Sequence, residues 1–87
     1  MRRAAKRDAT EAAIIKSLEH VGATVTQLSQ EGVPDLLVRF RDQWFLIECK
    51  SEGGKLTKAQ SDFDHYHGGL TFIVAYNPAE ALEGIGA

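Results

Sequence analysis

The sequence has a single cysteine, Cys49, among its 87 residues. One cysteine excludes an internal disulfide framework and a cysteine-rich zinc site, and it is typical of a protein of the reducing cytoplasm. No apolar run approaches the ~20 residues that a membrane-spanning helix requires. Residues 1–7 carry four basic side chains, and no apolar stretch follows them. We therefore expect a cytoplasmic protein without a secretory signal or a membrane span.

Positive charge is missing from the C-terminal part of the chain. From Asp62 to the end there is no lysine or arginine, so all ten basic residues lie within residues 1–61. The net charge of −2 argues against a protein that holds nucleic acid by electrostatics alone. The uneven distribution leaves two interpretations open. Either the acidic C-terminal part is a solvated surface, or residues 1–61 face a polyanion.

The composition is that of an ordinary globular domain, with 44% hydrophobic and 25% charged residues. Eighty-seven residues suffice for one small core, so we expect a single domain over 1–87 that begins with a basic segment at 1–7. A core of this size is marginally stable, and a partner subunit or a bound ion would add stability.

Hydrophobic periodicity predicts three helices and four strands in the order α-β-β-β-α-β-α. The helices are expected at 8–22, 57–67 and 78–87, and the strands at 23–28, 35–40, 44–50 and 70–76. The strand 44–50 is apolar on both faces, which is typical of a central position in a sheet. The tight connection at 41–43 predicts that this strand pairs antiparallel with the preceding one. The expected fold class is therefore α/β, with a mixed four-stranded sheet flanked by helices.

Local signals mark the ends and the buried faces of the helices. Capping boxes are expected at Asp8–Glu11 and Thr57–Gln60, and Asn77 followed by Pro78 is a typical helix start. The side chains expected to face the core are Ile14, Ile15, Leu18 and Val21 in the first helix, Leu56, Ala59, Phe63 and Tyr66 in the second, and Ala79, Leu82 and Ile85 in the third.

Two side chains of the strand 44–50 have both a structural and a chemical interpretation. Trp44 is expected in the core, with base stacking as the alternative. Cys49 is expected to be a packed core residue, since nothing near it in sequence indicates an activated nucleophile. The histidines His20, His65 and His67 do not have the spacing of a zinc site.

Polar residues stand at one end of the predicted hairpin. Asp35 begins one strand and Glu48-Cys49-Lys50 ends its partner, so they are expected to be neighbours. Glu48 and Lys50 share a face because side chains alternate along a strand. Two carboxylates suit Mg²⁺, which would polarise a phosphate, while Lys50 would stabilise the developing charge. The alternative is a salt-bridged trio of Asp35, Lys50 and Glu48 that joins the two strands.

For Glu11 and Gln60 the sequence leaves two roles open. Glu11 shares the helical stripe of Ile14 and Leu18, so it is a buried glutamate that requires a partner. It either contributes to the site or caps its own helix. Gln60 is either the capping partner of Thr57 or a contact to a substrate, and one amide can serve both purposes.

The segments GVPDLLV, WFLIECK and GKLTKAQSDF carry a specific resemblance. Asp35, followed thirteen residues later by Glu48-Cys49-Lys50, resembles the signature of the PD-(D/E)xK nucleases. The predicted element order is similar to their restriction-endonuclease-like core. Within that superfamily, roughly residues 8–87 resemble the stand-alone VRR-Nuc nucleases of phages and bacteria. One departure is that Val74-Ala75-Tyr76 contains no arginine where the family has its Val-Arg-Arg-like stretch.

The resemblance implies a site by position. The implied catalytic residues are Glu11, Asp35, Glu48, Lys50 and Gln60. The implied metal ligands are Asp35, Glu48, Glu11 and the backbone carbonyl of Cys49. The implied cofactor is Mg²⁺, for which Mn²⁺ would substitute.

The resemblance also implies an activity and partners. The expected reaction is hydrolysis of phosphodiester bonds in structured DNA, similar to that of Holliday-junction resolvases, by a homodimer in a bacterial or phage-infected cell. Helix 57–67 and strand 70–76 are the expected dimer contact. The side chains expected to contact DNA are Arg2, Arg3, Lys6, Arg7, Lys55 and Lys58, of which the last two are simply solvated in the alternative interpretation. Two other classes of function stay open: a catalytically silent module that binds DNA junctions or assembles on the same fold, and a structural oligomerisation domain.

Overall fold

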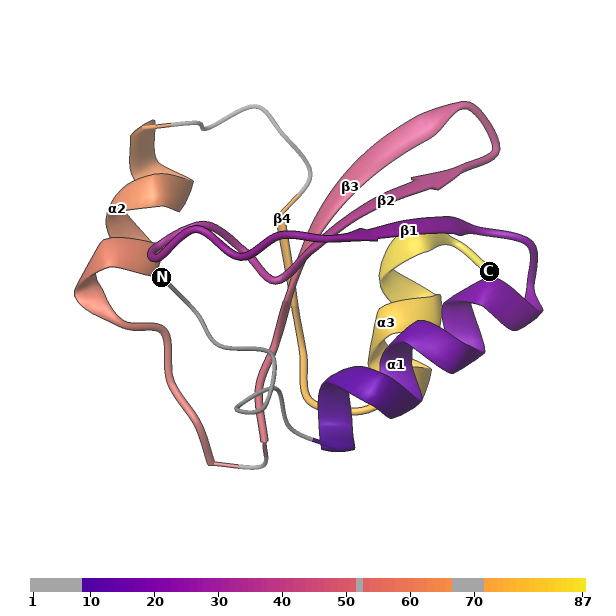
Figure 1. The fold of residues 1–87 in the computed structure, drawn as a ribbon, viewed down its shortest axis with the longest axis horizontal. Coiled ribbons are helices and arrows are strands. Elements are labelled where there is room, and N and C mark those ends of the chain that lie inside the picture. The colour runs from indigo at the N-terminus through magenta and orange to yellow at the C-terminus, as the bar shows by residue number, and fades with distance from the viewer. Residues whose placement is uncertain (1–8, 52, 67–71) are drawn as a thin grey trace.

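The computed structural model describes residues 9–51, 53–66 and 72–87, and Figure 1 shows its ribbon. Along the chain the elements are α1 (Ala9–His20), β1 (Thr24–Gln27), β2 (Leu36–Phe40), β3 (Gln43–Cys49), α2 (Lys58–Tyr66), β4 (Phe72–Ala75) and α3 (Pro78–Ile85). Their order and the mixed four-stranded sheet confirm the predicted α/β fold class. The predicted cap at Asp8, the basic segment 1–7 and residues 67–71 lie outside the described part of the chain.

The strand order β1-β2-β3-β4 places β3 between two neighbours. The pairs β1–β2 and β2–β3 are antiparallel, whereas β3 and β4 pair parallel. The β2–β3 turn is tight because Arg41 and Asp42 have positive φ angles of 53° and 65°, as a two-residue type I′ hairpin requires. The central position and the antiparallel partner predicted for residues 44–50 are thereby confirmed.

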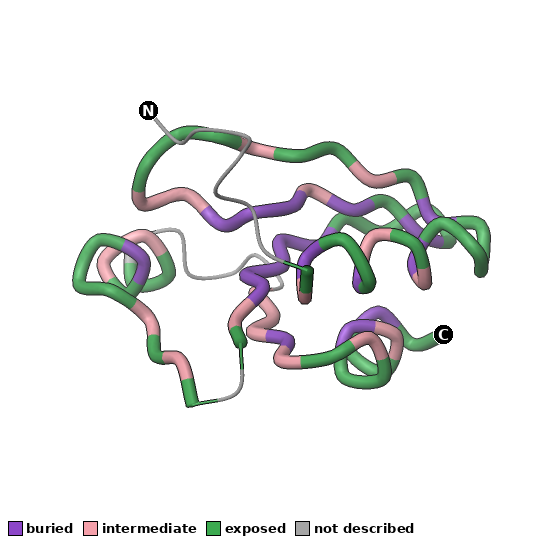
Figure 2. The backbone as a smooth tube through the Cα atoms, turned by 60° about the horizontal axis from the view of Figure 1, so that its bottom comes forward, coloured by how far each residue is buried: buried purple, intermediate pink, exposed green. Residues whose placement is uncertain are grey.

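One face of the sheet is covered by α1 and α3, which lie side by side (Figure 1). The core cluster between the helices and the sheet includes Ile14 and Leu18 of α1, Val38 of β2, and Phe45 and Ile47 of β3. Figure 2 shows these buried positions as purple segments along the central strands and the inward sides of the two helices. Burial of such aliphatic and aromatic side chains is the main force that stabilises the fold.

The opposite face of the sheet is covered much less. Leu37, Leu46 and Phe72 form a row across β2, β3 and β4, and the first and last of them are only half-buried. Helix α2 lies beyond one end of the sheet, apart from α1 and α3 (Figure 1). Trp44 belongs to this face by strand alternation and is 57% exposed, so its predicted place in the core is wrong. Its exposure follows from the position of α2, which lies at the other end of the sheet.

Three helix positions expected to face the core are exposed instead. Val21 lies beyond the last residue of α1, in the turn that Gly22 ends with a φ of 94°, so helical spacing no longer applies there. Ala59 is exposed on α2, which does not pack along the sheet. Ala79 is exposed because α3 turns Ala81 and Ile85, rather than its first turn, toward the core.

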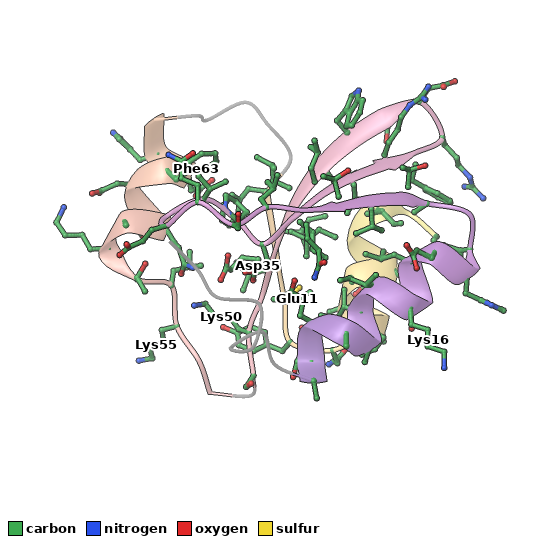
Figure 3. All side chains as sticks on the ribbon, in the orientation of Figure 1. Glu11, Lys16, Asp35, Lys50, Lys55 and Phe63 are labelled. Carbon is green, nitrogen blue, oxygen red and sulfur yellow. The ribbon has the colours of Figure 1, made fainter. Side chains whose placement is uncertain are left out.

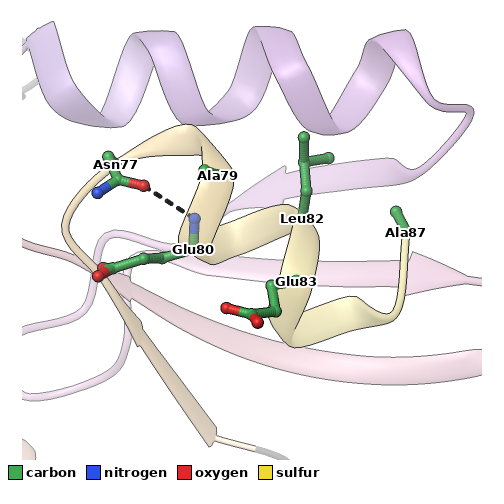
Figure 4. A pocket seen from close by; sticks show the side chains of 6 residues that line it. All are labelled: Asn77, Ala79, Glu80, Leu82, Glu83 and Ala87. Atoms are coloured by element: carbon green, nitrogen blue, oxygen red, sulfur yellow. Dashed lines mark hydrogen bonds between the residues drawn. The ribbon is translucent and has the colours of Figure 1, made fainter.

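The start of α3 follows its sequence signals. The Asn77 side chain accepts a hydrogen bond of 2.9 Å from the Glu80 backbone N–H, and Pro78 occupies the first helical turn (Figure 4). The open hollow in that view is lined by Asn77, Ala79, Glu80, Leu82, Glu83 and Ala87. None of these is a predicted site residue. Among the described residues, no helix is both long and apolar enough to cross a membrane.

Candidate metal and catalytic site

The β2–β3 pairing brings together the acidic residues at the end of the hairpin. Leu36 is the register partner of Ile47, so Asp35 and Glu48, one step further along each strand, lie opposite each other. Both are buried, with exposed fractions of 6% and 2%. Figure 3 shows Asp35 close to Lys50 in the space between α1 and α2. The predicted proximity of Asp35 to the Glu48–Lys50 segment is confirmed.

Asp35 is held in place by the backbone of β3. Its Oδ2 atom accepts a buried hydrogen bond of 2.9 Å from the Cys49 N–H. The next residue, Lys50, donates its backbone N–H to the Ala75 carbonyl at 3.0 Å, which continues the β3–β4 ladder. The Cys49 side chain itself is buried in the core cluster, as predicted. The aspartate is therefore oriented by a strand that is fixed on both sides.

Glu48 has one satisfied oxygen and one unsatisfied oxygen. Its Oε2 atom accepts a hydrogen bond of 2.7 Å from Gln60 Nε2 and lies 3.4 Å from Lys50 Nζ. Its Oε1 atom is buried and has no hydrogen-bond partner among the described residues. Buried carboxylate oxygens are normally paired, so this oxygen is available to a ligand.

The electrostatics of Glu48 indicate what kind of ligand suits this oxygen. Burial, and next the charge of Asp35, raise the pKa of Glu48 from 4.5 to about 7, although Lys50 acts in the opposite direction. One lysine therefore does not compensate two buried carboxylates. A divalent cation between them would supply the positive charge and would occupy the free Oε1 atom. The residues present thus fit a Mg²⁺ ion.

Gln60 joins the second helix to this site. Its Oε1 atom accepts from the Thr57 backbone N–H at 2.9 Å, and Thr57 Oγ1 accepts from the Gln60 N–H at 3.2 Å. This is the predicted capping box. The Nε2 atom of the same amide reaches Glu48, so one side chain serves both the cap and the site. The loop before β2 also approaches α2 closely at Gly32. A Cβ atom added at Gly32 would stand 3.1 Å from the Ala59 Cβ, so this position has little room for a side chain.

Replacement of Gln60 by alanine removes both functions at once. We expect Gln60→Ala to lower the free energy of unfolding by about 2–3 kcal/mol, because it removes a cap and leaves a buried carboxylate with one hydrogen bond fewer. Thr57→Ala, which removes only a cap contact, should cost about 1 kcal/mol. Chemical denaturation measures both. Equal losses for the two variants would contradict a structural role of the Gln60–Glu48 bond, and the exposed Gln30→Ala is the neutral control.

Glu11 lies on the buried stripe of α1 where the sequence predicts it. It is buried with Ile14 and Leu18 on the inward side of α1, and its Oε2 atom accepts a hydrogen bond of 3.0 Å from Gln27 Nε2. Across the described residues, no group of three or more Asp, Glu, His or Cys side chains is arranged to hold a metal ion. The structure thus pairs Asp35 with Glu48, and the role of Glu11 as a direct ligand stays a prediction.

The contact to Gln27 was not expected from the sequence, although a signal for it exists. Gln27 is two residues from Val25, which packs against the core cluster under α1. Strand alternation places both side chains on that face. A polar residue on a strand face that turns toward a buried glutamate is therefore a candidate partner.

The basic residues expected to contact DNA are only partly described. Lys55 and Lys58 are exposed, and Lys58 pairs with Asp62 one helical turn away at 2.9 Å. Gly54, the neighbour of Lys55, accepts a hydrogen bond of 2.7 Å from the hydroxyl of Tyr76, the residue that follows β4. The remaining four, Arg2, Arg3, Lys6 and Arg7, lie outside the described residues. Contact of all six with DNA stays a prediction.

The chain was compared with protein-family models, with curated proteins and with solved structures, and none of the three comparisons found a match. The resemblance to nucleases therefore depends on the motif residues, and the case for a function depends on the geometry of Asp35, Glu48, Lys50 and Gln60.

Proposed function

We propose that the chain is a Mg²⁺-dependent endonuclease that hydrolyses phosphodiester bonds in branched DNA, as in the VRR-Nuc branch of the PD-(D/E)xK nucleases. The observation that carries the proposal is the buried Oε1 atom of Glu48, which has no hydrogen-bond partner in the described part of the chain and lies beside Asp35 and Lys50. A pair of buried carboxylates next to a lysine at the end of a sheet combines a cation site with a group that stabilises negative charge.

Asp35 and Glu48, with the backbone carbonyl of Cys49, would hold the ion. When bound, Mg²⁺ lowers the pKa of a water and polarises a phosphate oxygen. Asp35 contributes a carboxylate whose direction is fixed by the Cys49 N–H. Glu48 contributes one whose other oxygen is held by Gln60. Fixed donors and acceptors reduce the reorganisation that a reaction requires.

Lys50 has a separate part in the proposal. Its side chain is 17% exposed, so its ammonium group can meet a substrate while it stays near Glu48. There it would stabilise the negative charge that grows on the phosphate oxygens during hydrolysis. It would also orient the attacking water by a hydrogen bond.

The alternative of a salt-bridged trio is disfavoured by the direction of the Glu48 pKa. A carboxylate whose main interaction is with a lysine has a lowered pKa. Burial and Asp35 raise the pKa of Glu48 to about 7 instead. The alternative of a silent DNA-binding module keeps the same geometry, and only a cleavage assay distinguishes it from an enzyme.

A homodimer is part of the proposal. One copy has a half-covered sheet face with Leu37 and Phe72, and β4 is an edge strand, apolar from Phe72 to Ala75. Exposed apolar edges of this kind are normally covered by another chain or element. Two copies related by a twofold axis would bring one site to each strand of a branched duplex.

The proposal is tested by incubating the protein with an end-labelled four-way DNA junction and Mg²⁺. We expect cleavage by the wild type and a decrease of about 10²–10³-fold for Lys50→Ala, the size of effect seen when one charge-stabilising group is removed. Lys16→Ala, a change at an exposed residue of α1, is the matched control and should cleave normally. Intact junctions with wild type and Lys50→Ala alike, with any divalent ion, would exclude an enzyme.

A further inference from the structure

The tip of the β2–β3 hairpin presents an unusual combination of side chains. Trp44 is 57% exposed, and the guanidinium carbon of Arg39, its cross-strand partner, lies 6.0 Å from the centre of the indole ring. Arg41 lies 4.7 Å from the centre of the Phe40 ring. The one acid at the tip is Asp42, whose side chain pairs with Arg39 at 2.9 Å. An exposed tryptophan with two arginines and one acid is poorly explained by folding stability alone.

The conformation of the β2–β3 turn keeps the two arginines outside the core. Arg41 and Asp42 both have positive φ, which costs energy for residues other than glycine. The two-residue connection leaves the arginines at the end of a stiff hairpin rather than on a loose loop. A hollow of about 220 Å³ at the tip is lined by Gly22, Thr24, Arg39, Phe40, Arg41 and Asp42. Arg39 is paired with Asp42, so the Arg41 guanidinium is the group beside this hollow that suits a phosphate.

Trp44 at the tip and the candidate site share one face of the sheet. Trp44, Leu46 and Glu48 alternate with the buried Phe45 and Ile47, so they all lie on the face opposite α1 and α3. Four residues of β-strand span about 13 Å. Duplex DNA rises ~3.4 Å per base pair, so this length corresponds to about four base pairs. A DNA strand that lies along β3 would reach both places.

We propose that the hairpin tip is a second DNA contact, in which Trp44 stacks on an unpaired base near a branch point, about four base pairs from the Asp35–Glu48 site, and Arg41 binds a backbone phosphate beyond that base. The inference rests on the proposed function, since it takes branched DNA as the ligand. Stacking on an aromatic ring requires a base that has left the duplex, which branch points supply. Two arginines against one acid give the tip a net positive charge, which suits a polyanion.

The test uses the full chain in EDTA, so that binding is measured without cleavage. The probes are a labelled four-way junction with two unpaired bases at the branch and a continuous duplex of equal length. We expect Trp44→Ala to weaken binding to the junction about tenfold and to leave binding to the duplex unchanged, whereas Trp44→Phe should stay within twofold of the wild type. A Trp44→Ala protein that binds the junction like the wild type would overturn the proposal.

Arg41 gives an independent measurement. Arg41→Ala should weaken binding to both DNAs and reduce the slope of log K against log salt by about 0.9, the value for one phosphate contact. Lys16→Ala, at an exposed lysine on α1, is the matched control and should keep the wild-type slope. An unchanged slope for Arg41→Ala would overturn the phosphate contact.

Trp44 is the single tryptophan of the chain, so intrinsic fluorescence reports on this residue alone. We expect the junction with unpaired bases to quench it and the duplex to leave it unchanged. If Trp44→Ala instead converts a dimer to a monomer in sedimentation, the tip is a protein interface and the proposal fails. If the wild type never cleaves DNA but the tip variants still lose binding, the proposed activity fails and this inference stands. If the wild type cleaves and the tip variants bind normally, this inference alone fails.

Discussion

Asp35→Asn is expected to lower cleavage of a four-way junction about 10³-fold and to leave the fold intact. The asparagine oxygen can still accept the hydrogen bond from the Cys49 N–H, so the contact that fixes β2 to β3 is kept. What is lost is one of two negative charges that would hold Mg²⁺. Several kcal/mol of charge stabilisation by the metal corresponds to roughly 10³-fold in rate.

The measurement is single-turnover cleavage at saturating protein, with Mg²⁺ varied over a wide range. Loss of a ligand predicts that higher Mg²⁺ concentrations recover part of the activity of Asp35→Asn but none of that of Lys50→Ala. Asp64→Asn is the matched control, because Asp64 is an exposed aspartate on α2. Full activity of Asp35→Asn at every Mg²⁺ concentration would disprove the proposed ligand role.

Glu48→Gln is expected to make the metal-free protein more stable. Glu48 is buried, and its pKa is raised from 4.5 to about 7 by burial and by Asp35. Above pH 7 the wild type must keep this carboxylate charged in the folded state, whereas the amide variant has no charge to bury. A shift of this size corresponds to about 3 kcal/mol as an upper limit. That is a large fraction of the stability of a domain of this length.

The dependence on pH follows from which state binds more protons. Between pH 4.5 and about pH 7, the folded wild type keeps a proton on Glu48 that the unfolded chain has released. The contribution of this group to the free energy of unfolding therefore falls as pH rises through that window, and it is constant above it. The free energy of unfolding of Glu48→Gln does not show this decrease with pH. The two proteins should be equally stable near pH 4 and should differ most at pH 8.

Urea denaturation at several pH values in EDTA, repeated with Mg²⁺, measures the effect. The wild type should gain stability from Mg²⁺ at pH 8 and the variant should gain little. Glu19→Gln, at an exposed glutamate of α1, should follow the wild type. A destabilised Glu48→Gln in EDTA would instead support the salt-bridged trio, since the variant then loses a favourable contact to Lys50.

The parts of the fold that the sequence predicted correctly are those with a local cause. β3 reads as central because Phe45, Leu46 and Ile47 leave no polar face, and the structure gives it two neighbours. The capping box of Thr57 and Gln60 depends on residues three apart, and it is present. The meeting of Asp35 and Glu48 follows from hairpin geometry once the turn at residues 41–42 is recognised.

The parts that were wrong or unforeseen depend on contacts distant in sequence. Trp44 was assigned to the core because large aromatic residues in apolar strands are usually buried. Its exposure depends on where α2 packs, and no local sequence pattern predicts that position. The Gln27–Glu11 bond joins residues sixteen positions apart and needs the packing of α1 on β1. The bond from Gln60 to Glu48 was not predicted, since the alternative to the cap was a contact to a substrate. An amide that caps a helix carries no local signal for the partner of its other polar atom.

The parallel pairing of β3 and β4 has a consequence for the order in which the chain folds. β1, β2 and β3 are joined by short connections, so we expect their contacts to form before β4 joins β3 across the longer crossover through α2. Lys50 donates its backbone N–H to Ala75 of β4, so the lysine is fixed only at that late step. A chain that has not finished folding would thus bring its carboxylates together without placing its lysine. Under the proposed function, hydrolysis of DNA would be restricted to fully folded molecules.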